Sequence, residues 1–250
     1  MKRGILFAGA ATAVLVFCSL VWSAGDAPWR TVAGFPFGRY IVLEPKNPPR
    51  DQWPLLFVLH GLNGEAQSYG RLWREATGGA YLVVAPQALP KIRGDMKISM
   101  WNGSGHDDRN YLLAVWDEIH KKYPIDPART VVIGYSAGGY ALWTIVNARN
   151  DQLAAVIFQA AVPRWNEPAI KGKHVYLIAG EADGSFDREK GGKAIDYLTR
   201  MGADVQLYVA PGADHGSVYD KVQSAAKWIA DGFPSASKPA GAVKAPDGGP

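Results

Sequence analysis

A run of three β-branched residues, 131–133, leads directly into a Gly-x-Ser-x-Gly motif at residues 134–138. Apolar residues at helical spacing follow between 142 and 146, so a strand, a tight turn and a helix are predicted in that order. Such a turn tolerates only small residues two positions before and after the serine, and glycine has no Cβ to collide. The turn is expected to expose the Ser136 hydroxyl at the carboxyl end of a strand. It also aims the first amides of the next helix at the same point.

Continuous apolar runs, typical of strands covered on both faces, alternate with helical patterns along the rest of the chain. The runs lie at 53–59, 81–85, 153–158, 174–179 and 205–209, and the helical patterns at 65–77, 107–123, 188–201 and 217–230. An antiparallel hairpin is expected around Phe35–Gly38 at a sheet edge. This alternation predicts an α/β protein, with a mostly parallel sheet flanked by helices on both faces. In such sheets, ligands bind at the carboxyl ends of the strands.

The two ends of the chain differ from its middle. Residues 1–24 resemble a signal peptide, because two basic residues precede an uncharged run to Trp22 and small residues follow it. An uncleaved membrane anchor is the alternative, since the run approaches the length of a membrane-spanning helix. Residues 25–233 are long enough for one globular domain with a sizeable core. Residues 234–250 are rich in Pro, Ala and Gly and are predicted to form a disordered tail.

Cysteine usage and charge narrow the compartment and the partners. Cys18, the single cysteine, lies in the predicted leader, so the mature chain is expected to have no disulfide and no thiol nucleophile. A predicted leader followed by a mature chain without disulfides favours a secreted or periplasmic protein of a bacterial envelope. The formal net charge is +4. Removal of the leader leaves +2 and removal of the tail leaves +1, which argues against binding to nucleic acid or to an anionic membrane.

A serine hydroxyl needs a base that takes its proton and a third group that orients the base. His215 follows the apolar run at 205–209, and Asp183 follows the run at 174–179. Both are therefore expected at the sheet edge that carries Ser136. Asp183 could instead only shape a turn, with Glu181 or Asp187 as the acid, and His215 could only cap a helix. The other four histidines lie in an earlier motif, beside or within helices, or at a strand start, where a base is not expected.

Two backbone N–H groups are predicted to form an oxyanion hole. One belongs to Ala137, the residue after the serine, and the other to Leu62, in the loop after the run at 53–59. Gly61 is the second choice for that donor. His60 is predicted to brace this loop as a buried structural residue and not to act as a catalyst.

Three further residues fall in loops at the strand ends and are candidates to line a substrate site: Trp101, His106 and Trp165. For the two tryptophans the alternative is ordinary packing, because aromatic side chains are mostly buried for packing. The length of the domain leaves little room for a separate lid, so an open site for bulky or polymeric substrates is expected.

Taken together, these motifs resemble the α/β-hydrolase superfamily and, within it, the secreted feruloyl esterase and polyhydroxybutyrate depolymerase group. The residues that carry the resemblance are Arg39–Pro45, His60-Gly61, Trp101, Asp107-Asp108, Ile125–Arg129, the Gly-Tyr-Ser-Ala-Gly-Gly motif, and the Asp183 and His215 loops. The resemblance implies a catalytic domain over residues 25–233. It also implies a Ser–His–Asp acyl-enzyme mechanism with no metal and no organic cofactor.

The favoured hypothesis is a serine esterase that cleaves a hydroxycinnamoyl or acetyl sugar, or a hydroxyalkanoate oligomer. Its partner would be a small-molecule or polymeric ester, with no nucleic acid and no stable membrane partner once the leader is removed. A serine peptidase or acyltransferase on the same fold is the first alternative. A non-catalytic binding protein is the second, although binding alone does not require a strained serine.

Overall fold

The computed structural model describes residues 27–93, 96–101, 106–163, 170–184 and 188–235. Its centre is an eight-stranded sheet with the strand order β1-β2-β4-β3-β7-β8-β9-β10. The strands are β1 (Arg30–Thr31), β2 (Arg39–Leu43), β3 (Trp53–Leu59), β4 (Leu82–Pro86), β7 (Ile125–Tyr135), β8 (Ala155–Gln159), β9 (His174–Gly180) and β10 (Asp204–Ala210). β1 and β2 pair antiparallel, β2 and β4 pair antiparallel, and the remaining neighbours are parallel. The α/β prediction is therefore confirmed.

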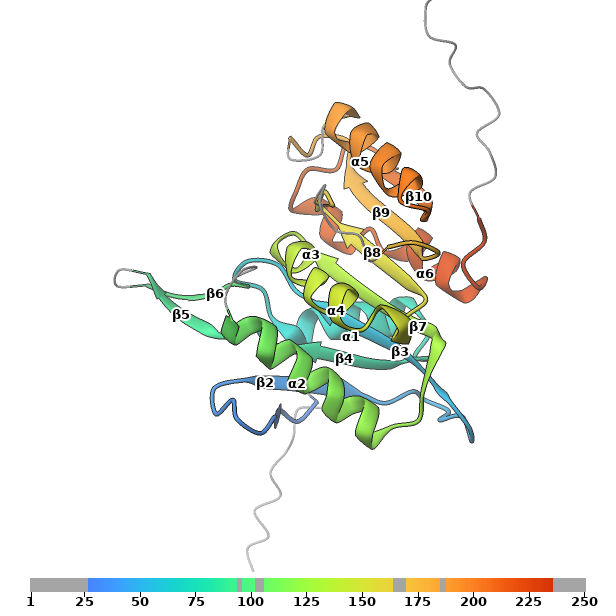
Figure 1. Cartoon of the computed structure of the whole chain (residues 1–250). Helices are drawn as coiled ribbons and strands as arrows, with labels where there is room; N and C mark the ends of the chain where they lie inside the picture. The colour runs from blue at the N-terminus through green and yellow to red at the C-terminus, as the bar shows by residue number, and fades with distance from the viewer. Residues whose placement is uncertain (1–26, 94–95, 102–105, 164–169, 185–187, 236–250) are drawn as a thin grey trace, which may run out of the picture.

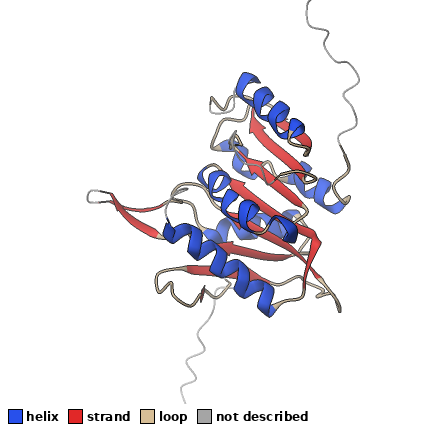
Figure 2. Cartoon of the chain, in the orientation of Figure 1, coloured by secondary structure: helices blue, strands red, loops and turns tan. Residues whose placement is uncertain are grey.

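Helices cover both faces of this sheet (Figures 1 and 2). They are α1 (Ala66–Ala76), α2 (His106–Lys122), α3 (Ala137–Ala141), α4 (Trp143–Ala148), α5 (Arg188–Arg200) and α6 (Gln223–Ala230), with 3₁₀ turns η1 (Asn150–Gln152) and η2 (Ser217–Asp220). α2, α4 and α5 contribute side chains to the core on one face, and α1 and α6 contribute to the core on the other.

The uninterrupted apolar run of β3 follows from this two-sided cover. Leu55, Phe57 and Leu59 point into the core beneath α2, while Leu56 and Val58 point into the core beneath α1. All five side chains are fully buried. Because successive side chains of a strand point to opposite faces, a strand buried on both sides needs apolar residues at every position.

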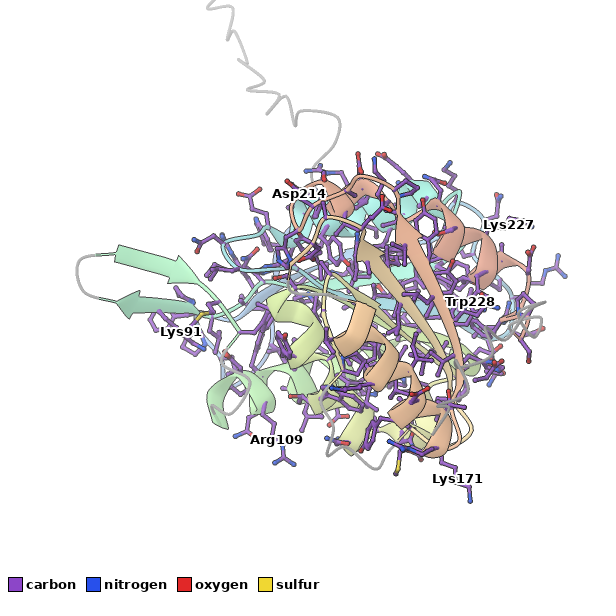
Figure 3. The ribbon with its side chains drawn as sticks, turned by 90° about the horizontal axis from the view of Figure 1, so that it is seen from above. Lys91, Arg109, Lys171, Asp214, Lys227 and Trp228 are labelled. Atoms are coloured by element: carbon purple, nitrogen blue, oxygen red, sulfur yellow. The ribbon has the colours of Figure 1, made fainter. Side chains whose placement is uncertain are left out.

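Two segments differ from the sequence prediction. The region 87–105, predicted to be a loop, contains an antiparallel hairpin of β5 (Pro90–Arg93) and β6 (Met96–Ser99) that projects from the body (Figures 1 and 3). Its four-residue strands mix polar and apolar residues and are too short to show a period. The single helix predicted at 217–230 is divided into η2 and α6.

The predicted leader, 1–24, lies outside the described residues, as does most of the predicted tail. Among the helices that are described, none combines the length and the apolar character that a membrane crossing requires.

Phe158 tests the contribution of the core. Its side chain is fully buried on β8 and its ring centroid lies 5.6 Å from that of Trp143. Phe158→Ala is expected to lower the free energy of unfolding by about 3 to 5 kcal/mol, because the lost apolar contacts leave a cavity. Phe37, which is 78% exposed, provides the matched control. Phe37→Ala should change the free energy of unfolding by less than about 0.5 kcal/mol. Urea denaturation measures both, and similar losses in the two variants would contradict this picture of the core.

Candidate active site

Ser136 lies at a strained turn between β7 and α3. Its backbone has φ 50° and ψ −114°, a left-handed φ that residues other than glycine rarely adopt. The glycines on either side are required by contact. A Cβ on Gly134 would lie 2.4 Å from the carbonyl oxygen of Gly138, and one on Gly138 would lie 2.1 Å from that of Leu59. The backbone N–H of Ser136 donates to the carbonyl of Gln159 on the neighbouring strand, at 2.8 Å.

His215 and Asp183 form a hydrogen-bonded chain with this serine. The Nε2 atom of His215 lies 2.9 Å from the Oγ of Ser136, and its Nδ1 atom lies 2.9 Å from the Oδ2 of Asp183. The side chain of Asp183 is 2% exposed, whereas that of His215 is 45% exposed. The carboxylate can therefore hold the ring from the protein side, while the other ring nitrogen faces the serine at an accessible surface.

The loops that carry the acid and the histidine are tied to each other. The backbone N–H of Ala182 donates to the carbonyl of Ala213 at 2.9 Å, and the N–H of Gly212 donates to Glu181 Oε2 at 2.9 Å. Glu181 thus supports the histidine loop through the Gly212 N–H, and the carboxylate bonded to His215 is that of Asp183. Of the alternative acids, Asp187 lies outside the described residues.

Asp214, next to the histidine, closes a turn. Its Oδ1 atom accepts hydrogen bonds from the backbone N–H and the hydroxyl of Ser217, both at 2.7 Å. These bonds to Ser217 lower the pKa of the Asp214 carboxyl, because they stabilise its charged form. The side chain therefore shapes the start of η2 and leaves His215 to face Ser136.

A buried amide under the histidine loop has no counterpart in the sequence analysis. Gln159, at the carboxyl end of β8, accepts a hydrogen bond from Tyr69 Oη at 2.7 Å. Its Nε2 atom donates to the carbonyls of Val218 and Tyr219, at 2.8 and 2.7 Å. Since Gln159 is fully buried and its carbonyl also binds the Ser136 N–H, one residue fixes both the serine turn and η2. The sequence signal for this residue was a glutamine, Gln159, directly after the apolar run at 153–158.

Tyr135 supports the histidine from the other side. Its hydroxyl donates to the backbone carbonyl of His215 at 2.8 Å, and its ring packs against the rings of Tyr69 and Tyr219. Tyr135, the motif residue before the serine, therefore also supports the loop that carries His215.

The loop after β3 passes directly beside Ser136. A Cβ on Gly61 would lie 3.4 Å from the Cβ of Ser136, and Leu62 follows with a side chain that is 55% exposed. Within the described residues, neither the N–H of Leu62 nor that of Ala137 donates a backbone hydrogen bond. Ala137 is the first residue of α3, and the first N–H groups of a helix have no acceptor inside it, so the Ala137 N–H is available to an anion near the serine. The matching role of the Leu62 N–H, which lies in a loop, stays a prediction.

His60 holds this loop in shape. Its Nδ1 atom lies 2.6 Å from the carbonyl oxygen of Gly61, so Nδ1 carries the proton and donates. Its Nε2 atom accepts from the backbone N–H of Ala88 at 3.1 Å and also faces the amide of Gln87. Burial lowers the pKa of His60 from 6.5 to about 4, and the donors around Nε2 agree with a neutral ring.

Trp101 is not an open substrate-lining residue, and that prediction is corrected. Its side chain is 5% exposed, and its indole N–H donates to the carbonyl of His60 at 2.7 Å. It packs under the loop as a second brace, since its polar atom is used by the backbone. His106 is the first residue of α2, but its side chain is outside the described set, as is the whole of Trp165.

This constellation can activate a hydroxyl as a nucleophile beside the free N–H group at the start of α3. Within the described part of the chain, no three His, Cys, Asp or Glu side chains cluster closely enough to hold a metal ion.

The pKa of His60 predicts a dependence of stability on pH. Between pH 6.5 and about 4 the unfolded chain protonates this histidine and the folded chain does not, so the folded state loses stability as the pH falls. The loss should reach about 2 to 3 kcal/mol by about pH 4.5. His60→Gln, which retains an acceptor for Ala88, should show a smaller loss than the wild type between pH 7.5 and 4.5 in urea denaturation. Equal losses would contradict the assignment.

Comparison with known proteins adds two partial sequence matches. Residues 95–172, which include Ser136, match the model of the prolyl oligopeptidase family. A segment of 105 residues, 41% of the chain, is 29% identical to the bifunctional acetylxylan esterase/xylanase of Neocallimastix patriciarum. The match covers 15% of that protein, so it concerns one part of a much longer chain.

Solved structures match over most of the chain. The Bacillus cereus carboxylesterase superposes with a TM-score of 0.62 and 19% identity, covering 79% of this chain and 96% of its own. The Mesorhizobium loti carboxylesterase gives 0.62 and 19% over 82% and 98%. A dienelactone hydrolase from Klebsiella pneumoniae, described as putative, gives 0.58 and 17% over 82% and 98%. With its sheet order and its serine turn, the chain has the α/β-hydrolase fold.

Proposed function

We propose that this protein hydrolyses carboxylic esters through an acyl-enzyme on Ser136. The observation that carries the proposal is the unbroken chain of hydrogen bonds from Ser136 through His215 to Asp183. A structural role alone does not require a left-handed serine whose hydroxyl faces a histidine nitrogen. The esterase names of the sequence relative and of the similar structures support the same chemistry.

In the first half of the reaction, Ser136 Oγ attacks the ester carbonyl carbon and its proton moves to Nε2 of His215. The carbonyl oxygen becomes an oxyanion, which the N–H groups of Leu62 and Ala137 stabilise. The C–O bond to the alcohol then breaks, and the Nε2 proton passes to the leaving oxygen. An acyl-serine remains and the alcohol departs.

In the second half, a water molecule attacks the acyl-serine and gives a proton to His215 Nε2. Collapse of the second tetrahedral intermediate releases the carboxylic acid, and Ser136 Oγ takes the proton back. Asp183 remains ionised throughout. It acts as a positioning residue that holds the Nδ1–H tautomer and stabilises the charged ring.

The exposed site favours esters that belong to large molecules. His215 has a side chain that is 45% exposed, and Leu62, in the loop next to Ser136, is 55% exposed. Acetylated or hydroxycinnamoylated sugars and hydroxyalkanoate oligomers are the substrate classes that we propose. Action outside the cytoplasm, in the periplasm or in the medium, is part of the proposal and depends on the leader sequence.

A serine peptidase is the second candidate, because a prolyl oligopeptidase model matches the segment around Ser136. The same three side chains can attack an amide. The two candidates separate on paired substrates that share an acyl group, a para-nitrophenyl ester and a para-nitroanilide. Faster turnover of the anilide would favour the peptidase.

Removal of the nucleophile tests the proposal. Ser136→Ala should lower kcat on para-nitrophenyl acetate by about 10⁴-fold or more, because the acyl-enzyme can no longer form. A spectrophotometric assay measures the release of nitrophenol from para-nitrophenyl acetate, butyrate and longer esters, and chromatography measures the ferulic acid released from methyl ferulate.

Ser68→Ala is the matched control, since this serine is an exposed residue of α1 outside the proposed catalytic residues and the loops that hold them. It should keep most of the activity. A fluorophosphonate should label the wild type at Ser136 and not the Ser136→Ala variant. Turnover that survives in Ser136→Ala would sink the mechanism, and absence of both turnover and labelling in the wild type would favour a binding protein.

Gln159→Met tests the support of the base. Methionine fills a similar volume but leaves the Tyr69 hydroxyl and two carbonyls of η2 without a partner. His215 should then be less well positioned, and kcat should fall by about 10- to 100-fold, with a smaller change in KM. Steady-state kinetics and the rate of fluorophosphonate labelling measure the effect on variants whose folding is checked by urea denaturation.

Gln206→Met, on the edge strand β10, is the matched control because this side chain binds only the Pro234 carbonyl. Tyr69→Phe removes a single bond of the network and should lie between the control and Gln159→Met. If Gln159→Met folds and its kcat is unchanged, the position of His215 does not depend on this amide.

A further inference from the structure

Two adjoining hollows lie beside the loop that carries the proposed oxyanion donor. One has a volume of about 760 Å³ and the other of about 560 Å³. Both are lined by Trp29, Arg39, Gln87 and Ser99, so they form one elongated groove. None of its lining residues was proposed as a site residue from the sequence, and the mechanism above uses none of them.

The groove begins next to the proposed catalytic centre. Its wall includes Asn63 and Gly64, which directly follow Leu62. Asn63 is fixed to the hairpin, because its N–H donates to the carbonyl of Ser99 at 2.7 Å and its Oδ1 atom accepts from the Ser99 N–H at 3.2 Å. A Cβ on Gly61 would lie 3.4 Å from the Cβ of Ser136, and Asn63 is two residues further on, within about 7 Å of Gly61 along the chain. A single substrate molecule can therefore occupy the groove and also place its scissile ester at Ser136.

Two aromatic side chains are exposed along the groove. Trp29 is 38% exposed in the wall common to both hollows, and Phe37 is 78% exposed in the smaller hollow. The guanidinium carbon of Arg39 lies 4.3 Å from the centroid of the Trp29 ring. Such contact fixes an aromatic ring in place. A rigid exposed ring offers a surface on which the C–H face of a pyranose can stack.

The remaining lining is rich in groups that both donate and accept hydrogen bonds. Asn63, Gln67, Gln87 and Ser99 all contribute to the larger hollow. Gln67 is held by the carbonyl of Ala27, to which its Nε2 donates at 2.6 Å, and its buried Oε1 atom has no hydrogen-bond partner. Amides and hydroxyls suit a ligand with many hydroxyl groups.

Charge and polarity argue against other ligands of elongated shape. The larger hollow is lined by two cationic side chains, Arg39 and Arg71, and by the acidic Glu65. Because the Arg39 guanidinium lies over the Trp29 ring and Glu65 repels anions, this lining does not suit a polyanion. The amide-rich wall of the larger hollow does not suit a long acyl chain, which requires apolar lining along its whole length.

We propose that this groove binds the saccharide chain that carries the ester, so that the substrate is an esterified polysaccharide. This inference rests on the proposed function and narrows its substrate class. Trp29 and Phe37 stack on sugar rings, and the side chains of Asn63 and Gln67 bind hydroxyls, while the bonded amide of Gln87 holds the groove wall in place. The chain thus presents one of its esters to Ser136.

Binding is tested without catalysis in the Ser136→Ala protein. Isothermal titration with xylohexaose and cellohexaose, neither of which carries an ester, should detect binding of at least one of them. Addition of Trp29→Ala or Phe37→Ala should weaken that binding by about 10-fold, as loss of an aromatic anchor does. Leu207→Ala, on the opposite edge of the sheet and 41% exposed, should leave it unchanged. No binding of either hexaose, or equal binding by all variants, overturns the proposal.

Kinetics separate this proposal from the proposed function. In the active protein, the ratio of kcat/KM on acetylated xylo-oligosaccharides to kcat/KM on para-nitrophenyl acetate should fall about 10-fold in Trp29→Ala and in Phe37→Ala, mainly through KM. An unchanged ratio with normal Ser136-dependent turnover rejects the groove and keeps the esterase. If the wild type cleaves no ester, the esterase proposal fails, while the titration still decides whether the groove binds saccharides.

Discussion

The close approach of the serine turn to the end of β3 is the constraint on which the site depends. A Cβ on Gly138 would lie 2.1 Å from the carbonyl oxygen of Leu59. Only glycine at this position therefore allows the start of α3 to pack against the end of β3 and the loop that follows β3. This contact brings the loop of Gly61 and Leu62 next to Ser136. The proposed donors, the N–H groups of Leu62 and Ala137, thus belong to backbone that is packed within the sheet, which moves less than side chains do.

A second close approach positions the loop that carries His215, the proposed base. A Cβ on Gly180 would lie 2.3 Å from the carbonyl oxygen of Ala213, so the loops after β9 and β10 also meet through a glycine. Gln159 then joins this pair to the serine turn, because its carbonyl binds Ser136 and its side chain binds η2. The three proposed catalytic side chains come from three strands, yet each is connected to the next through a buried contact.

The sequence predicts the parts of this arrangement that depend on local chemistry. Buried strands read as apolar runs, and a tight turn around Ser136 requires glycine on both sides, so the sheet and the turn are predictable. The positions of Asp183 and His215 follow from strand ends. The hairpin at 90–99 is not predictable in this way, because its short strands lack a period. Trp101 was open to two interpretations, since an indole that packs and one that binds a ligand look the same in sequence.

Gln87 connects the two halves of the proposed substrate site. Its amide nitrogen lies 3.0 Å from Nε2 of His60, within the brace of the oxyanion loop, and 2.7 Å from Ser99 Oγ, in the wall of the groove. Its Oε1 atom accepts from the first N–H of α1, at Ala66. Because this amide is buried and bonded on every side, the groove cannot shift without disturbing the loop. A polymer bound there and the oxyanion donors would therefore keep a fixed spacing, which is what positioned cleavage of a pendant ester requires.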